Sequence, residues 1–152
     1  MIESIESKSI GTFTYNESDK SWRMEEGKLH WYLNATGKQA DVAVLLHKAE
    51  RLFEDLRSFE TQAKAAVAAA LINYKNDFWP DYDEDDEDLD WDAVEAGDFN
   101  TTKEVFQESI TLRDIVIGID SIYCEYDDGD LFGGHRIHAY FNEEYELVKA
   151  NI

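Results

Sequence analysis

Residues 80–92, PDYDEDDEDLDWD, place nine carboxylates in the twelve positions after Pro80. So dense a group of acids has three uses in a protein: it binds a cation, imitates a polyanion, or only keeps the chain soluble. Aromatic side chains stand between these acids, and such side chains commonly anchor protein contacts. We therefore predict a partner-binding site made of Asp81, Tyr82, Asp83, Glu84, Asp85, Asp86, Glu87, Asp88, Asp90, Trp91 and Asp92.

A specific calcium site is the first alternative for the acidic run. An EF-hand loop that begins at Asp81 needs Gly at its sixth position and Glu at its twelfth. The sequence has Asp86 and Asp92 there, so the residue for the tight turn is missing. We expect no cofactor and no specific metal, and weak collection of divalent ions by the run stays open as an alternative.

The residues that commonly carry out catalysis form no familiar constellation. The histidines are His30, His47, His135 and His138. None has the spacing of a metal-ligand pair, and residues three apart on a strand, such as His135 and His138, point to opposite faces. The sequence also lacks a nucleophile elbow, a P-loop and a dinucleotide fingerprint. We therefore predict a protein that is not an enzyme.

Cysteine usage and the N-terminus bear on the compartment. Cys124 is the only cysteine, so no intramolecular disulfide forms and a reducing compartment fits best. It alternates with Ile122 and Tyr126, as a buried structural thiol does. The opening MIESIESKSIG has neither a basic nor an apolar region of a secretion signal, and no apolar run approaches the length of a membrane span. We expect a cytoplasmic protein.

Charge is distributed unevenly along the 152 residues. Residues 1–79 carry 12 acids and 10 bases, whereas residues 80–152 carry 22 acids and 4 bases. Nucleic acid and anionic membrane are disfavoured as ligands, because both require a basic surface. A basic protein is the favoured partner, and charge that serves solubility alone is the competing interpretation.

Hydrophobic periodicity predicts strands and then helices before the acidic run. Residues 9–15 alternate as a strand does, and residues 21–35 contain two short strands around a turn at Glu26-Gly27. Apolar residues recur with helical period over 41–57. A second, alanine-rich helix is predicted from a cap at Ser58 to Trp79, because Pro80 disfavours helical geometry in the residue before it.

The second half returns to strands. We predict an acidic loop over 80–100, then a short helix opened by a capping box from Thr101 to Glu104. The period becomes two afterwards, with Arg113, Ile115, Ile117 and Ile119 on one strand face and further strands at 122–126, 137–141 and 147–148. This order predicts one α+β domain over 1–152, with an antiparallel sheet and a two-helix layer on one face.

The stretch DDGDLFGGHRIHAYFN, residues 127–142, can be interpreted from its residues. Asp128 and Gly129 form a turn, and a hairpin turn also explains the local acids better than a metal site does. Leu131 and Phe132 are expected to plug the end of the sheet, while Gly133 and Gly134 permit a bulge or a positive φ. His135 is expected to bond Asp130 or a backbone carbonyl, and a ligand role for these two residues is the alternative.

This stretch also resembles the D-G-D-L-F-W-G-H-x-I pattern near the end of a bacterial domain-of-unknown-function family, number 2262. TTKEVFQESITLRDIVI is similar to the element that precedes the pattern there, and IGTFTYNESDKSWRMEEGKL to the opening strands. The chain departs from the pattern at Gly133, and the acidic run is not part of it. The resemblance implies no enzyme activity, and by analogy it suggests a small bacterial accessory protein, such as an immunity protein.

The leading hypothesis is a non-catalytic immunity or antitoxin protein that neutralises a basic bacterial toxin such as a nuclease. A nuclease needs a basic cleft for phosphate, and a carboxylate-rich surface can occupy that cleft. The alternatives are a DNA mimic that inhibits a nucleic-acid-binding protein and a divalent-metal-binding domain.

Overall fold

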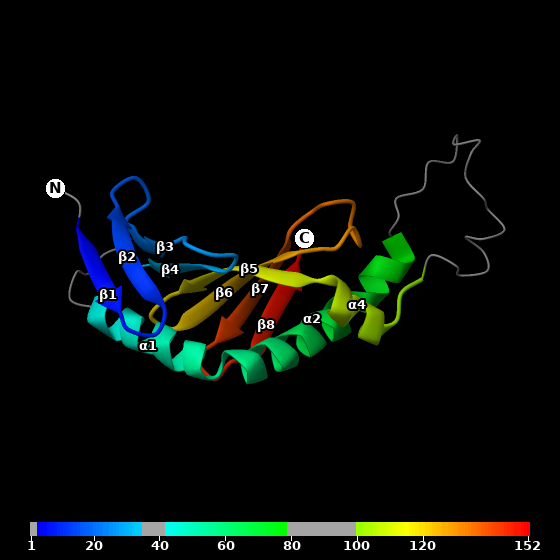
Figure 1. Cartoon of the computed structure of the whole chain (residues 1–152). Helices are drawn as coiled ribbons and strands as arrows, with labels where there is room; N and C mark the ends of the chain where they lie inside the picture. The colour runs from blue at the N-terminus through cyan, green and yellow to red at the C-terminus, as the bar shows by residue number, and fades with distance from the viewer. Residues whose placement is uncertain (1–2, 35–41, 79–99) are drawn as a thin grey trace.

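The computed structural model describes residues 3–34, 42–78 and 100–152 (Figure 1). The predicted site residues 81–92 therefore lie outside the described residues. The strands are β1 Ser4–Ser7, β2 Gly11–Asn16, β3 Ser21–Met24, β4 His30–Asn34, β5 Thr111–Ile117, β6 Ser121–Asp127, β7 Ile137–Asn142 and β8 Leu147–Asn151. They form one eight-stranded sheet whose spatial order follows the chain. The predicted α+β class and a mainly antiparallel sheet are confirmed.

The sheet consists of two antiparallel meanders, β1–β4 and β5–β8, joined by one parallel pair. β4 and β5 run parallel, with His30 opposite Asp114 and Leu33 opposite Ile117. Adjacent parallel strands need a long crossover connection, and the helices supply it. The helical segment and the acidic run are thus both placed in the single connection between the two meanders.

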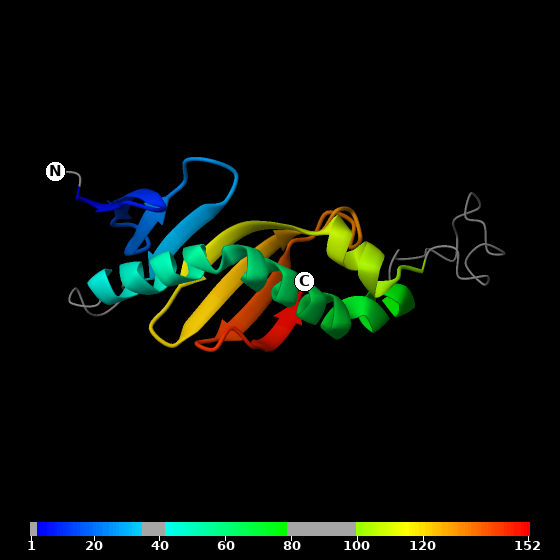
Figure 2. The same cartoon turned by 60° about the horizontal axis from the view of Figure 1, so that its bottom comes forward.

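Three described helices occupy this connection: α1 Val42–Glu54, α2 Leu56–Phe78 and α4 Lys103–Ser109. α1 and α2 follow one another along the sheet rather than lying side by side (Figure 2). The amide of Asp55 donates to the carbonyl of Arg51 at 3.2 Å, and the carbonyl of Asp55 accepts from the amide of Phe59 at 2.9 Å. Helical hydrogen bonding therefore continues across Asp55, so Ser58 lies inside α2 and the predicted cap there is wrong.

The core lies between the helices and one face of the sheet. Leu45, Ala49 and Leu52 of α1 and Ala63, Val67 and Leu71 of α2 are buried, as the helical period predicts. α1 contacts β4 and β5, and α2 contacts β8 and α4. The facing strand residues are the alternate ones, among them Trp31, Ile115, Cys124, Ala139 and Phe141. The buried thiol predicted for Cys124 is confirmed, and burial raises its pKa.

Two local predictions in the second half need correction. Arg113 is the extra residue of a β-bulge in β5, so Leu112, rather than Arg113, joins the buried face with Ile115 and Ile117. Ile119 lies in the following turn and is exposed. The N-cap of α4 is Thr102 rather than Thr101, because its Oγ1 accepts from the amide of Val105 at 3.2 Å.

Candidate functional site

The structure places the residues on either side of the segment 79–99, which contains the acidic run, at one end of the sheet. The described chain stops at Phe78 of α2 and resumes at Asn100, just before α4. α2 and α4 pack against each other beside the loop between β6 and β7 (Figure 1). We call this region the distal end, defined by residues 74–78, 100–109 and 128–135.

Asn76 links the described residues on either side of this segment to each other. Its Nδ2 donates to the carbonyl of Thr101 at 3.0 Å, and its Oδ1 accepts from the amide of Thr101 at 2.7 Å. One side-chain amide thus satisfies both backbone groups of a residue 25 positions away. The described chain segments before and after the acidic run are therefore hydrogen-bonded to each other, and we call these two segments the base.

Apolar side chains are exposed beside this base. Phe78 is 61 %, Val105 50 % and Tyr74 41 % exposed. The Tyr74 ring lies 5.1 Å from that of Phe78 and 6.1 Å from that of the buried Phe132. We call Tyr74, Phe78 and Val105 the base patch. Exposed aromatic side chains that pack on buried aromatic side chains are typical of contact surfaces between proteins.

A buried carboxylate organises the loop of residues 128–135. Asp128 Oδ2 accepts from the amides of Phe132 at 2.9 Å and Gly134 at 3.0 Å, and Oδ1 accepts from Asp130 at 3.0 Å. These bonds fold the loop around Asp128 and carry Phe132 into the core against Phe106. The prediction that Phe132 plugs the end of the sheet is confirmed.

Glycines in this loop permit conformations that other residues rarely adopt. Gly133 and Gly134 have φ of 67° and 90°, as predicted. Gly129 has a φ of 58°, and a Cβ on it would lie 2.2 Å from the carbonyl oxygen of Ser109. Only glycine therefore allows the loop to approach the end of α4 so closely.

The predicted bond from the His135 side chain to Asp130 or a backbone carbonyl stays a prediction. Asp130 is an exposed residue with a φ of 67°, and the amide of His135 donates to the carbonyl of Phe132 at 3.4 Å. Asp128 has the organising role, which sequence reasoning missed. The D-G-D spacing was the available signal, because a short acid at a turn commonly accepts backbone bonds.

Asp127 adds a second carboxylate contact at the same loop. Its Oδ1 accepts from the amide of Gly129 at 3.0 Å, and Arg113 lies 3.4 Å from its Oδ2. The backbone bond from Gly129, with the bond and charge of Arg113, lowers the pKa of Asp127. The local acids thus serve the turn, and the described ranges contain no group of three or more His, Cys, Asp or Glu residues placed to hold a metal ion.

The opposite face of the sheet carries a cross-strand row that the sequence analysis did not identify. The register aligns His30, Asp114, Glu125 and His138. His30 Nδ1 lies 3.4 Å from Asp114 Oδ1, and the Tyr123 hydroxyl lies 3.1 Å from Glu125 and 2.5 Å from His138 Nδ1. The sequence contained one signal of this row: Tyr123 and Glu125 occupy the positions of β6 between the buried residues.

The hydroxyl of Tyr123 links two members of this row, Glu125 and His138. Because a phenol has one proton, donation from Tyr123 to Glu125 leaves His138 Nδ1 as the donor of the other bond. Burial, with the charge of Glu125 nearby, raises the pKa values of Tyr123 and Asp114. Tyr123 and Asp114 are therefore held in their neutral forms more strongly than free side chains, and the hydroxyl of Tyr123 joins Glu125 and His138 through hydrogen bonds.

The fold and the distal end define a class: a small α+β protein with a single sheet and an acidic connection between its meanders. The chain belongs to domain-of-unknown-function family 2262, described as an uncharacterized protein conserved in bacteria, which matches residues 7–152. The resemblance noted for residues 127–142 is thereby confirmed. No curated protein and no solved structure matches the chain. Of the helices in the described ranges, none is both long and apolar enough to cross a membrane.

Proposed function

We propose that this chain is a non-catalytic binding protein of the bacterial cytoplasm that neutralises a basic toxin, such as a nuclease, as an immunity protein does. The charge distribution carries the proposal: residues 80–99 hold 11 acids and no base. A surface of this kind complements the basic cleft with which a nuclease holds phosphate.

The base patch and the Asn76 bonds support the proposal from the described residues. Charge mainly accelerates encounter, whereas buried aromatic contacts slow dissociation. Phe78 is the last described residue before the acidic run, so its exposed ring lies next to the charge in the chain. The expected interface thus combines steering by the acids with an apolar contact on Tyr74, Phe78 and Val105.

Two other functions make different predictions. A DNA mimic competes with DNA for many unrelated basic proteins, whereas an immunity protein binds one partner tightly. A divalent-metal protein binds calcium, magnesium or zinc in calorimetry at concentrations where an acidic surface alone gives no saturable heat.

The test uses the product of the neighbouring reading frame, expressed in a bacterial host with and without this chain. We expect the neighbouring product to be toxic and the chain to restore growth by binding it. The combined change Asp83→Lys, Asp85→Lys and Asp86→Lys should abolish rescue, and Phe78→Ala should weaken it. The matched control, Glu3→Lys, Glu6→Lys and Glu17→Lys, makes the same charge change in the first meander and should retain rescue. The proposal is wrong if the neighbouring product is harmless, or if the distal and control variants rescue equally.

A further inference from the structure

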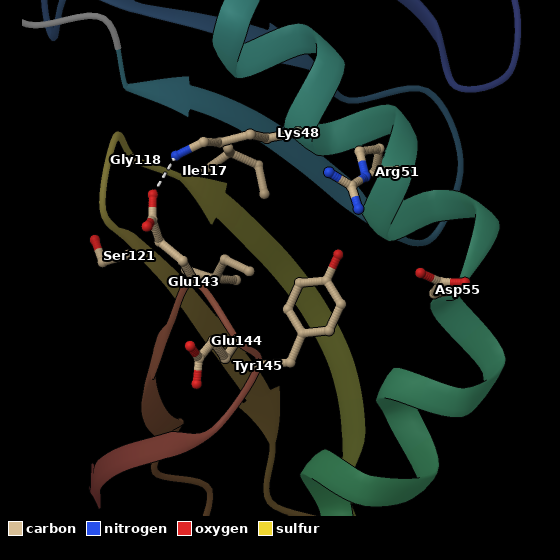
Figure 3. A pocket seen from close by; sticks show the side chains of 10 residues that line it. Lys48, Arg51, Asp55, Ile117, Gly118, Ser121, Glu143, Glu144 and Tyr145 are labelled. Carbon is tan, nitrogen blue, oxygen red and sulfur yellow. Dashed lines mark hydrogen bonds and ion pairs between the residues drawn. The ribbon is translucent and has the colours of Figure 1, made fainter.

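A cavity lies at the other end of the second meander, away from the distal end. Its walls are α1, the turn between β5 and β6, and the turn between β7 and β8 (Figure 3). Its volume is about 380 Å³, and its floor includes Ile117 and Ile122. Pockets for small molecules typically occupy about 300–1,000 Å³ and are partly apolar, so the size suits a small organic ligand.

Lys48 ties the walls of this cavity together. Its Nζ donates to the carbonyl of Ile119 in one turn and lies 2.7 Å from Glu143 Oε1 in the other. Both turns are thereby attached to α1, although Glu143 is 95 positions away in the chain. The Lys48 ammonium also neutralises Glu143, so neither group is the main recognition element for a ligand.

The turn between β7 and β8 holds Tyr145 at the cavity in an unusual conformation. Asn142 Oδ1 accepts from the amides of Glu144 at 2.9 Å and Glu146 at 3.0 Å. Tyr145 has a φ of 69°, which is uncommon for an aromatic residue. Its ring packs edge-on against Phe59 at 5.6 Å, and its hydroxyl points toward Arg51 (Figure 3). An unfavourable backbone conformation that positions a polar group in a cavity is typical of a functional site.

The remaining polar groups of the cavity have both signs of charge. The side chains of Arg51, Tyr145 and Ser121 make no hydrogen bond or ion pair with any described residue. Asp55 and Glu144 add carboxylates to the same lining. Arg51 and Asp55 lie one helical turn apart and both face the cavity (Figure 3).

We infer that this cavity binds a small zwitterion of the amino-acid type. Arg51 and the Tyr145 hydroxyl take the carboxylate, Asp55 or Glu144 takes the ammonium group, and Ile117 and Ile122 contact the apolar part. A simple anion fits less well, because a chain with a net charge of −20 repels it at long range. A zwitterion has no net charge, and its two ends match the two signs present. This inference does not depend on the proposed function.

The test is a titration of the full, isotopically labelled chain with each standard L-amino acid at up to about 10 mM, followed by amide NMR spectra. At least one amino acid should shift the amides of residues 117–122 and 143–146 saturably. Acetate and methylamine, which each offer one of the two charges, should bind at least about tenfold more weakly. The inference is overturned if no amino acid gives a saturable shift, or if acetate binds as tightly as the best amino acid.

Matched variants assign the binding to Arg51. Arg51→Gln should weaken binding by about tenfold or more, because it removes the one cation of the cavity that is not engaged by a described residue. Arg57→Gln makes the same change at an exposed position outside this cavity and should leave binding unchanged. Tyr145→Phe should weaken binding a few-fold. Equal binding by the Arg51 and Arg57 variants, with spectra that show both folded, would reject the site.

Discussion

The two ends of the second meander are formed by the same strands, but the turns at the two ends pack differently against the helices. At the distal end, the buried Asp128 carboxylate draws its loop inward, and Phe132 fills the space against α2 and α4. At the other end, Asn142 organises an exposed turn that Lys48 links to α1, and a cavity lies between the turn and the helix. One end is filled and the other is hollow.

Under the two proposals, this difference separates two tasks. A filled end suits the attachment of the charged segment for which we propose a partner outside the molecule. A hollow end with polar walls suits a ligand that enters the molecule. Both depend on a short acid or amide that accepts backbone bonds in a turn, and this side chain is buried at the distal end and half-buried at the other end.

The largest expected effect therefore comes from removing these two side chains in turn. Asp128→Ala leaves the buried amide of Phe132 and the part-buried amide of Gly134 without their acceptor, and should cost about 4 kcal/mol in the free energy of unfolding. Asn142→Ala removes a less buried acceptor and should cost about 1 kcal/mol. Urea unfolding measures both values. Equal costs would contradict the distinction between a filled and a hollow end.

A smaller effect is expected from Tyr126, which is buried in β6 one residue before Asp127. Its hydroxyl has no hydrogen-bond partner in the part of the chain that the structure describes. A buried hydroxyl without a partner costs free energy, so Tyr126→Phe should raise the free energy of unfolding by about 1 kcal/mol. A loss of stability in the same urea experiment would show that the hydroxyl is satisfied by a bound water.

The smallest effect concerns the charge of Asp127 at the distal loop. Its pKa is lowered in the folded state, so its carboxylate adds stability above the ordinary value of 3.8, and this stability is lost as the pH falls through the folded pKa. Asp127→Asn should lower the melting temperature by a few degrees at pH 7 and have little effect near pH 2. The same loss at both pH values would mean that shape, rather than charge, explains the role of Asp127.

Much of the fold could be predicted because one face of the sheet is buried. The alternation of Ile122, Cys124 and Tyr126 identified β6 and its buried side, since side chains of a strand alternate between faces. The bulge at Arg113 was missed because one extra residue leaves the apolar pattern locally ambiguous. The cap at Thr102 was misplaced by one position because two threonines are adjacent.

The sites were less predictable because they depend on contacts between distant parts of the chain. The cavity combines α1 with two turns, and the Lys48–Glu143 pair that holds it spans 95 positions. The register of four strands creates the row from His30 to His138, and no local spacing reveals it. The acidic run was evident from composition alone, but its predicted role as a binding site falls on residues outside those described.

The central claim is that the acids between the meanders steer a basic protein to the distal end. The most direct measurement is the association rate with the product of the neighbouring reading frame, the proposed toxin, by stopped flow from about 10 mM to about 500 mM salt. The chain with Asp83, Asp85 and Asp86 changed to Lys should associate at least about tenfold more slowly at low salt, and this difference should shrink at high salt. The account is contradicted if the variant and the native chain associate at the same rate at low salt.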